Sequence, residues 1–156
     1  FVISTGNIEV KVLGTSFEIK AYKDDDIATV TVLSGKVKVA INGKEGNIIL
    51  GPDDRMVYEM VNNEYKIQRV DAGESIAWVN GVLLFEESIL EDVFRQMERW
   101  YDLKIIVLEG INSNCTVSGR HKNQGYQIVL EGLAYTHGLE YQIKNDTVFI
   151  TKINCE

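Results

Sequence analysis

Residues 85–105, FEESILEDVFRQMERWYDLKI, contain the feature that most constrains the fold, a helical pattern of apolar side chains. Ser88 and Glu91 have the spacing of a capping box, in which two side chains bond the free N–H groups at a helix start. Glu91 and Arg95 form a favourable i,i+4 pair. The pattern predicts an amphipathic helix that begins near Ser88. Its buried face, spaced as one helical stripe, consists of Leu90, Val93, Phe94, Met97, Trp100 and Tyr101.

The chain before this helix has the pattern of short β-strands. Residues 8–12, IEVKV, alternate apolar and polar side chains, as in a strand with one buried face. Similar runs follow as far as residue 69, and Ser34-Gly35 and Asn42-Gly43 have the composition of tight hairpin loops. Short strands at this spacing predict an all-β domain, either a sandwich or a compact solenoid-like coil.

The second half alternates strand and helix patterns. Strand-like runs flank the central helix, and residues 115–118 predict a further strand that ends at Gly119. Residues 126–136 predict a second helix, which Gly138 ends in the left-handed conformation. A closing hairpin over residues 139–150 completes the order. This order predicts a duplicated strand–helix–strand unit, with two helices on one small sheet.

The two halves together predict a β plus α+β fold class, with an all-β domain at residues 1–77 and an α+β domain at residues 78–156. A length of 156 residues fits two small domains. The chain opens at residues 1–5 in a strand-like pattern, which we interpret as the start of a fragment of a longer protein.

Composition excludes several classes of partner. The net charge of −7 and a pI near 4.9 disfavour nucleic acid, because phosphate binding needs a positive field. The same charge disfavours an anionic membrane surface. No run approaches the roughly 20 apolar residues that a membrane-spanning helix needs. We therefore expect no nucleic-acid partner, and no membrane contact through the residues present.

Residues for catalysis or metal binding are sparse. Metal sites need clustered His, Cys or carboxylate side chains, whereas His121 and His137 are isolated. We interpret His137, beside Gly138, as stabilising a helix C-terminus, and His121 as a solvated residue of a polar loop. No nucleophile–base motif or phosphate-binding glycine loop is present. We expect no enzyme activity, no metal and no cofactor.

The two cysteines leave two alternatives open. Cys115 and Cys155 each sit beside a predicted strand of the second half, so they would pair in an oxidising compartment. Otherwise they are two unpaired thiols.

Four blocks of the chain, in order, resemble the periplasmic part of FecR-family anti-sigma factors of the Bacteroidetes type. Residues 12–19 (VLGTSFEI) resemble the family pattern V-L-G-T-S-F-x-V, and residues 30–37 (VTVLSGKV) resemble V-x-V-L-x-G-x-V. Residues 78–85 (WVNGVLLF) resemble W-x-x-G-x-L-x-F, and residues 90–101 resemble L-x-x-V-x-x-x-x-E-R-W-Y. The segment from residue 115 onward is similar to the short N-terminal domain of secretins and TonB-dependent transducers. One departure is Gly51-Pro52-Asp53-Asp54, which stands where the family commonly has P-G-E.

The resemblance implies a signalling protein in the periplasm, anchored by one inner-membrane helix outside this chain. Its expected partners are the signalling domain of a TonB-dependent outer-membrane transducer and an extracytoplasmic-function sigma factor, the latter bound by a cytoplasmic segment also outside this chain. The alternative is a carbohydrate-binding module, because aromatic side chains stack on sugars. The aromatic residues in question, which also suit a core, are Trp78, Trp100, Tyr101, Tyr135 and Tyr141.

We expect the transducer to dock on the second half, either by strand pairing or on a helix face. Strand pairing needs an unpaired edge, for which the candidates are the strand with Cys115 and Val117 and the strand with Thr147 and Phe149. Docking on the helix face would use the polar side of the central helix. Its candidate residues are Arg95 and Arg99.

Overall fold

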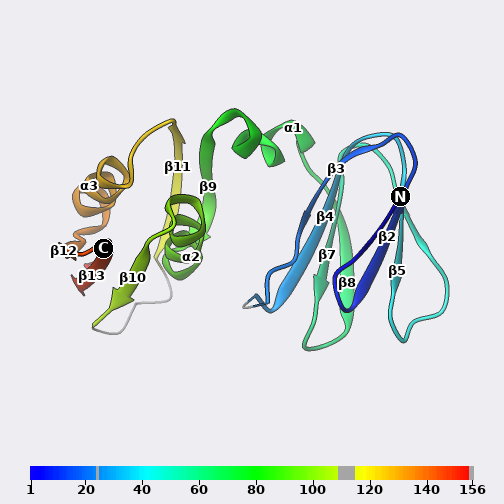
Figure 1. Ribbon diagram of the computed structural model, residues 1–156, viewed down its shortest axis with the longest axis horizontal. Coiled ribbons are helices and arrows are strands. Elements are labelled where there is room, and N and C mark those ends of the chain that lie inside the picture. Colours follow the sequence, from blue (N-terminus) through cyan, green and yellow to red (C-terminus); the bar gives the residue numbers. More distant parts are fainter. Residues whose placement is uncertain (24, 109–114, 155–156) are drawn as a thin grey trace. The chain divides into compact units, whose positions relative to one another are not determined.

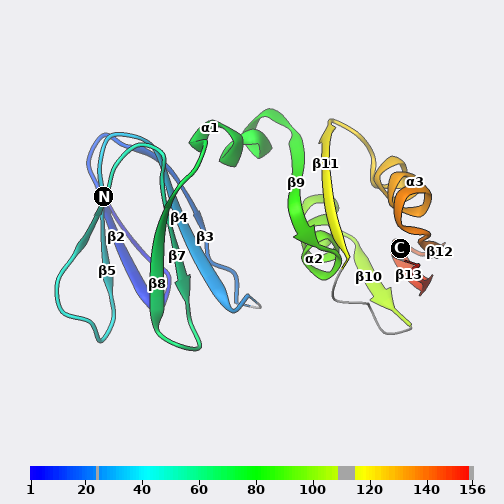
Figure 2. The same ribbon diagram turned by 180° about the vertical axis from the view of Figure 1, so that it is seen from behind.

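The computed structural model describes residues 1–23, 25–108 and 115–154. The chain divides into two compact units, Phe1–Ile76 and Ala77–Glu156, at a boundary one residue from the predicted one. Among the described residues, unit 1 has strands and one short α-helix, whereas unit 2 mixes strands with two longer α-helices (Figure 1, and from behind Figure 2). Each unit has its own apolar core.

Unit 1 is a sandwich of two four-stranded antiparallel sheets. The first sheet has the order β1 (Val2–Ser4), β2 (Ile8–Val12), β5 (Val37–Ile41), β6 (Ile48–Leu50). The second has the order β3 (Ser16–Lys20), β4 (Ile27–Ser34), β7 (Asp54–Glu59), β8 (Glu64–Arg69). Both sheets contribute to one core, so the sandwich, not the solenoid-like coil, describes this unit. Its buried side chains are Ile8, Val10, Ala28, Val30, Val32, Val37, Val39, Ile41, Leu50, Met56 and Tyr58.

The turn at Ser34-Gly35 is not the hairpin that its composition predicts. β4 pairs with β3 and β7, whereas β5 pairs with β2 and β6, so the turn carries the chain from one sheet to the other. Gly35 has φ +83°, and a Cβ there would lie 3.2 Å from the Thr15 side chain. Local composition predicts the turn but not which sheet the next strand joins. Asn42-Gly43, by contrast, does lie between two paired strands, β5 and β6, but the connection covers residues 42–47 and is not the tight loop that its composition predicts.

A short helix, α1 (Ala72–Ser75), is held to the second sheet by hydrogen bonds from a partly buried arginine. Arg55 of β7 donates from Nε to Thr31 Oγ1 of β4 at 3.0 Å and from Nη2 to Ser75 Oγ. Thr31 and Ser75 are both buried, so their hydroxyls need these bonds. The contact fixes the chain where it leaves the sandwich.

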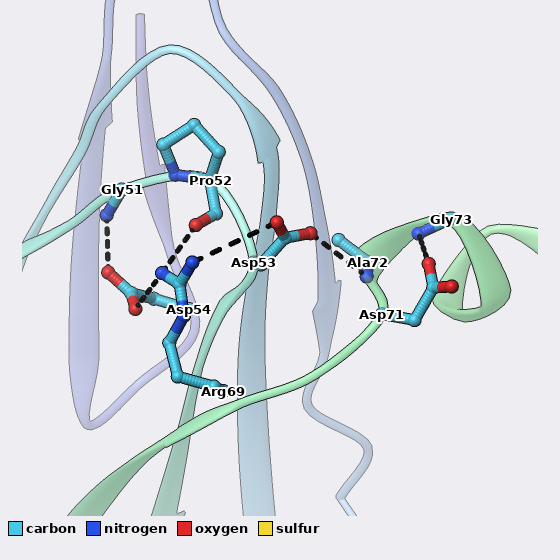
Figure 3. Close-up of polar contacts among 8 residues, drawn as sticks. All are labelled: Gly51, Pro52, Asp53, Asp54, Arg69, Asp71, Ala72 and Gly73. Atoms are coloured by element: carbon cyan, nitrogen blue, oxygen red, sulfur yellow. Dashed lines mark hydrogen bonds and ion pairs between the residues drawn. The ribbon is translucent and has the colours of Figure 1, made fainter.

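A polar cluster at the turn before β7 fixes the end of β8 (Figure 3). Arg69 donates from Nη1 to Asp54 Oδ1 at 2.9 Å and to Pro52 O at 2.7 Å. The other carboxylate oxygen of Asp54 accepts from Gly51 N at 2.7 Å. The Gly51 hydrogen bond, and then Arg69, lower the pKa of Asp54 below its ordinary value of 3.8. Asp53 adds an acceptor for the N–H of Ala72, at 3.4 Å.

Unit 2 contains two sheets and two helices around one core. β9 (Val82–Ile89) pairs antiparallel with β11 (Thr116–Lys122) in a two-stranded sheet. β13 (Thr147–Lys152) lies between β10 (Lys104–Val107) and β12 (Glu140–Lys144) in a three-stranded sheet. The prediction of two helices on one sheet is therefore wrong. The helices are α2 (Leu90–Tyr101) and α3 (Tyr126–His137), and a 3₁₀ turn, η1 (Ala77–Asn80), opens the unit.

The core of unit 2 joins both helices to strands of both sheets. Its buried side chains are Leu83, Phe85, Leu90, Val93, Phe94, Met97, Cys115, Val117, Val129, Leu130, Leu133, Leu139, Val148 and Ile150.

Helix α2 has the predicted buried stripe but not the predicted start. Leu90, Val93, Phe94 and Met97 are buried, and Trp100 and Tyr101 pack against the core. The capping box is wrong: Ile89 is the N-cap residue, without a side-chain cap, and Ser88 belongs to β9. Strand pairing extends to the helix boundary, where the N–H of Leu90 donates to Cys115 O at 3.0 Å. This bond satisfies one of the free N–H groups at the start of α2.

Replacing Asp54 by Asn tests the polar cluster. The lowered pKa means that the carboxylate stabilises unit 1 above the unfolded pKa, near 3.8, and that this contribution is lost as pH falls through the folded value. Solvent screening limits the loss for Asp54→Asn at pH 7 to about 0.5–1 kcal/mol. Urea unfolding followed by circular dichroism should show this difference shrinking toward pH 3. Glu45→Gln, at an exposed carboxylate, is the control; a difference independent of pH contradicts the assignment.

The helix ends of unit 2 give a second test. Gly138 ends α3 at φ +57°, and a Cβ there would lie 2.9 Å from Cβ of Asn154. Gly138→Ala should therefore lower the free energy of unfolding by about 1–2 kcal/mol. Asp102 ends α2 at φ 51°, so Asp102→Gly should raise it by about 0.5 kcal/mol. Trp78 and Trp100 both lie in unit 2, so tryptophan fluorescence follows the unfolding of this unit. Free energies of unfolding equal to that of the unchanged protein would contradict the prediction.

Candidate protein-binding edge of the second unit

Strand β11 has a neighbouring strand on one side only, among the residues that the structure describes. It runs antiparallel to β9, with His121 opposite Leu83 and Val117 opposite Ser88. A bulge in β9 places two residues opposite Ser118, and Glu87 in this bulge has φ 45° and donates its N–H to Ser118 Oγ at 3.0 Å. The other side of β11 is thus an edge of the sheet.

The backbone groups that point to this edge follow from the alternation of an antiparallel ladder. Asn123 N–H donates to Gly81 O at 2.9 Å, and Leu90 N–H donates to Cys115 O at the other end of the strand pair. Odd-numbered residues of β11 therefore bond β9. The N–H and C=O groups of Ser118, Arg120 and Lys122 point away from β9.

The end of helix α3 limits this edge at Thr116. His137 Nε2 lies 3.1 Å from Thr116 O, and Nδ1 lies 2.6 Å from Thr136 Oγ1. A carbonyl oxygen only accepts, so Nε2 carries the proton and donates. His137 thus stands in the last turn of α3, where the sequence predicts it, and also bonds the outward carbonyl of β11. The remaining edge runs from Ser118 to Lys122.

Two cationic side chains line this edge. Arg120 and Lys122 are exposed, whereas Val117 on the other face is buried in the core. His121 lies on the core face, half-buried, with its ring centroid 5.8 Å from that of Phe85. In a chain of net charge −7, the edge therefore combines unpaired backbone groups with local positive charge.

The sequence missed Arg120 and Lys122. It predicts that the strand ends at Gly119 and that His121 is a solvated loop residue; both predictions are wrong. After Val117 the sequence SGRHK has no apolar alternation, so pairing with β9 alone defines the rest of the strand. The apolar sequence of β9 was the one available signal, because such a strand needs a paired neighbour and the segment around Arg120 could have been assigned to it.

The expected edge at Thr147 and Phe149 is wrong. Both residues belong to β13, which has strands on both sides. Val117 does lie on an edge strand, with a buried side chain, so only its strand's backbone and outward side chains are available there. Cys115 is buried and disulfide-bonded. The possible partner, Cys155, lies outside the described residues.

The arginines expected on the helix face differ in their surroundings. Arg95 pairs with Asp92 at 2.7 Å and with Glu91 at 3.9 Å, so its charge is largely balanced within α2. Arg99 is exposed in the last turn. The structure does not bring these residues to the β11 edge through any contact that it describes, and their role in binding stays a prediction.

The candidate aromatic residues divide between core and surface. Trp100, Tyr101 and Tyr141 pack against the core of unit 2, whereas Trp78 and Tyr135 are exposed. Burial raises the pKa of Tyr101, and burial followed by the charge of Glu131 raises the pKa of Tyr141.

The part of the chain that the structure describes contains neither a grouped set of metal ligands nor a membrane-spanning helix. Within residues 1–23, 25–108 and 115–154, no three His, Cys, Asp or Glu side chains are grouped to hold a metal ion. No helix in that part of the chain is long and apolar enough to cross a bilayer.

Known proteins resemble this chain in both sequence and structure. The family described as FecR, C-terminal, matches residues 82–150. Two crystal structures, both described as a putative anti-sigma factor from Parabacteroides distasonis ATCC 8503, share 30% sequence identity with the chain at a TM-score of 0.85. The matches cover 97% of this chain and 71% and 70% of those chains. No curated protein matches. Similarity along nearly the whole length, together with the family match, shows that the chain belongs to the FecR family of anti-sigma factors.

Proposed function

We propose that this chain is the periplasmic relay of a transmembrane anti-sigma factor, and that unit 2 receives the signal from a TonB-dependent outer-membrane transducer. The transducer's signalling domain would add a strand to β11. One observation carries the proposal: β11 presents outward backbone groups from Ser118 to Lys122 with two cations beside them. Membership of the FecR family supports the regulatory role.

Strand addition suits this edge better than helix-face docking. Main-chain hydrogen bonds to Arg120 and Lys122 would supply affinity, and their side chains would favour a partner strand with acidic residues. On α2, Arg95 is already paired with two carboxylates, so a partner would have to displace them. On β11, by contrast, a partner strand would bond outward backbone groups that have no protein partner among the described residues.

A relay works only if the chain binds two states of the transducer, loaded and unloaded, with different affinity. In this proposal the loaded transducer exposes the complementary strand and the unloaded transducer does not, so occupancy of β11 reports the load. The family role then assigns release of an extracytoplasmic-function sigma factor to a cytoplasmic segment, beyond one inner-membrane helix. The chain itself would act by binding, without catalysis.

Charge reversal on β11 tests the docking site. Arg120→Glu with Lys122→Glu should weaken binding of the transducer's signalling domain at least about tenfold, because a favourable charge pattern becomes repulsive. Isothermal titration at two salt concentrations measures this, and higher salt should reduce the difference between the proteins.

The matched control is the double change Arg95→Glu with Arg99→Glu, which alters charge equally on α2. Strand addition predicts nearly unchanged affinity for this control. Loss of binding in the control, with β11 changes tolerated, would instead place the contact on the helix face. Glycan titration covers the carbohydrate-binding alternative, and saturable glycan binding without transducer binding would reject the relay.

A further inference from the structure

Unit 1 has an exposed edge strand, β8, that differs from the other edge strands of the sandwich. β1 and β6 have three residues each, and the pairing of β3 with β4 has a register shift between Ser16 and Phe17. Short strands and irregular pairing are devices that discourage strand addition at an edge. β8 has six residues and an unbroken register with β7.

β8 is exposed on both faces, including the face that points to the core. Tyr65 and Ile67 lie opposite Tyr58 and Met56, which are buried, yet they are 42% and 47% exposed. The facing sheet ends with the short strand β6, leaving a cleft of about 180 Å³ beside Tyr65. Lys44 Nζ lies 5.5 Å from the centre of the Tyr65 ring across this cleft.

The outward backbone groups of β8 are those of Tyr65, Ile67 and Arg69. Val70 N–H donates to Asp53 O at 2.9 Å, which makes the even-numbered residues of β8 the ones that bond β7. The bond from Met60 N to Asp26 O shows that the even-numbered residues of β7 bond β4. The odd-numbered residues of β7 therefore bond β8, in agreement with this alternation. The outward groups are therefore arranged symmetrically about Ile67.

We propose that β8 pairs with β8 of a second copy of this chain, antiparallel, about a two-fold axis at Ile67. This register pairs Ile67 with the partner subunit's Ile67 and Tyr65 with the partner subunit's Arg69. Three such pairs each exchange two hydrogen bonds, giving about six. The β3-β4-β7-β8 sheet of each copy would then join that of the other in one continuous sheet of eight strands.

Charge selects this register over the one with its axis at Lys66. With the axis at Ile67, Lys66 lies opposite the partner subunit's Gln68, and no like charges face each other. An axis at Lys66 would also align outward backbone groups, but it places Lys66 opposite the partner subunit's Lys66, which is repulsive. The two apolar side chains at the axis and the arginine beside a tyrosine ring favour the first register.

A contact of one strand pair is small, so the dimer should be weak, with a dissociation constant of tens of micromolar or more on an order-of-magnitude basis. Sedimentation velocity over about 5–500 μM should show a reversible monomer–dimer equilibrium. Ile67→Lys places two cations opposite each other at the axis. It should therefore raise the protein concentration at the midpoint of this equilibrium at least about tenfold. Ile49→Lys, at an isoleucine of β6 that is 57% exposed, is the matched control and should leave it unchanged.

Cysteine cross-linking tests the register. Directly opposed residues of a hydrogen-bonded pair have Cα atoms about 5.5 Å apart, within disulfide range. Ile67→Cys should therefore give a covalent dimer on mild oxidation, and Lys66→Cys should give much less. A chain that stays monomeric throughout, an Ile67→Lys protein that still dimerises, or preferential cross-linking at position 66 would overturn the proposal. Arg120→Glu with Lys122→Glu should leave dimerisation intact, which separates this interface from the transducer contact.

Discussion

Every backbone N–H and C=O group of a strand needs a hydrogen-bond partner, and an open sheet always leaves one row of them at each edge. This constraint organises both units. In unit 1, pairing between neighbouring strands satisfies all the rows of backbone groups except those at the four sheet edges. In unit 2, the strands divide into sheets of two and three, so β11 keeps an edge although the core behind it is closed. The two surfaces assigned to partners, on β11 and β8, are among these edges.

Packing decides how each edge is presented. Unit 2 buries one face of β11 through Val117, and His137 bonds the outward carbonyl of Thr116, so only the stretch up to Lys122 remains available. Unit 1 leaves β8 exposed on both faces and at the edge of its sheet, so both its apolar side chains and its outward backbone groups are accessible. Each edge presents three residues with outward backbone groups; the first edge is cationic, and the second is self-complementary. These differences suit a foreign acidic strand in one case and a second copy in the other.

Local periodicity predicted the elements well and their connections less well. The buried stripe of α2 follows from spacing alone, and so does the alternation of Ile8 and Val10 in β2. The sheet change at Ser34-Gly35 depends on which distant strands pair, information that two turn residues do not carry. The same holds for Thr147 and Phe149, which lie on a strand that looks terminal in sequence but is central in its sheet. Arg120 and Lys122 were missed because β9, not their own segment, makes them a strand.

Amide hydrogen exchange of unit 2, with and without the transducer's signalling domain, tests the account most directly. In the chain alone, the amide of His121 should exchange slowly because it faces β9, whereas the outward amides of Arg120 and Lys122 should exchange quickly. Strand addition predicts that binding protects Arg120 and Lys122 strongly and changes His121 little. Protection confined to α2, with the two outward amides still exchanging quickly in the saturated complex, would contradict docking on β11.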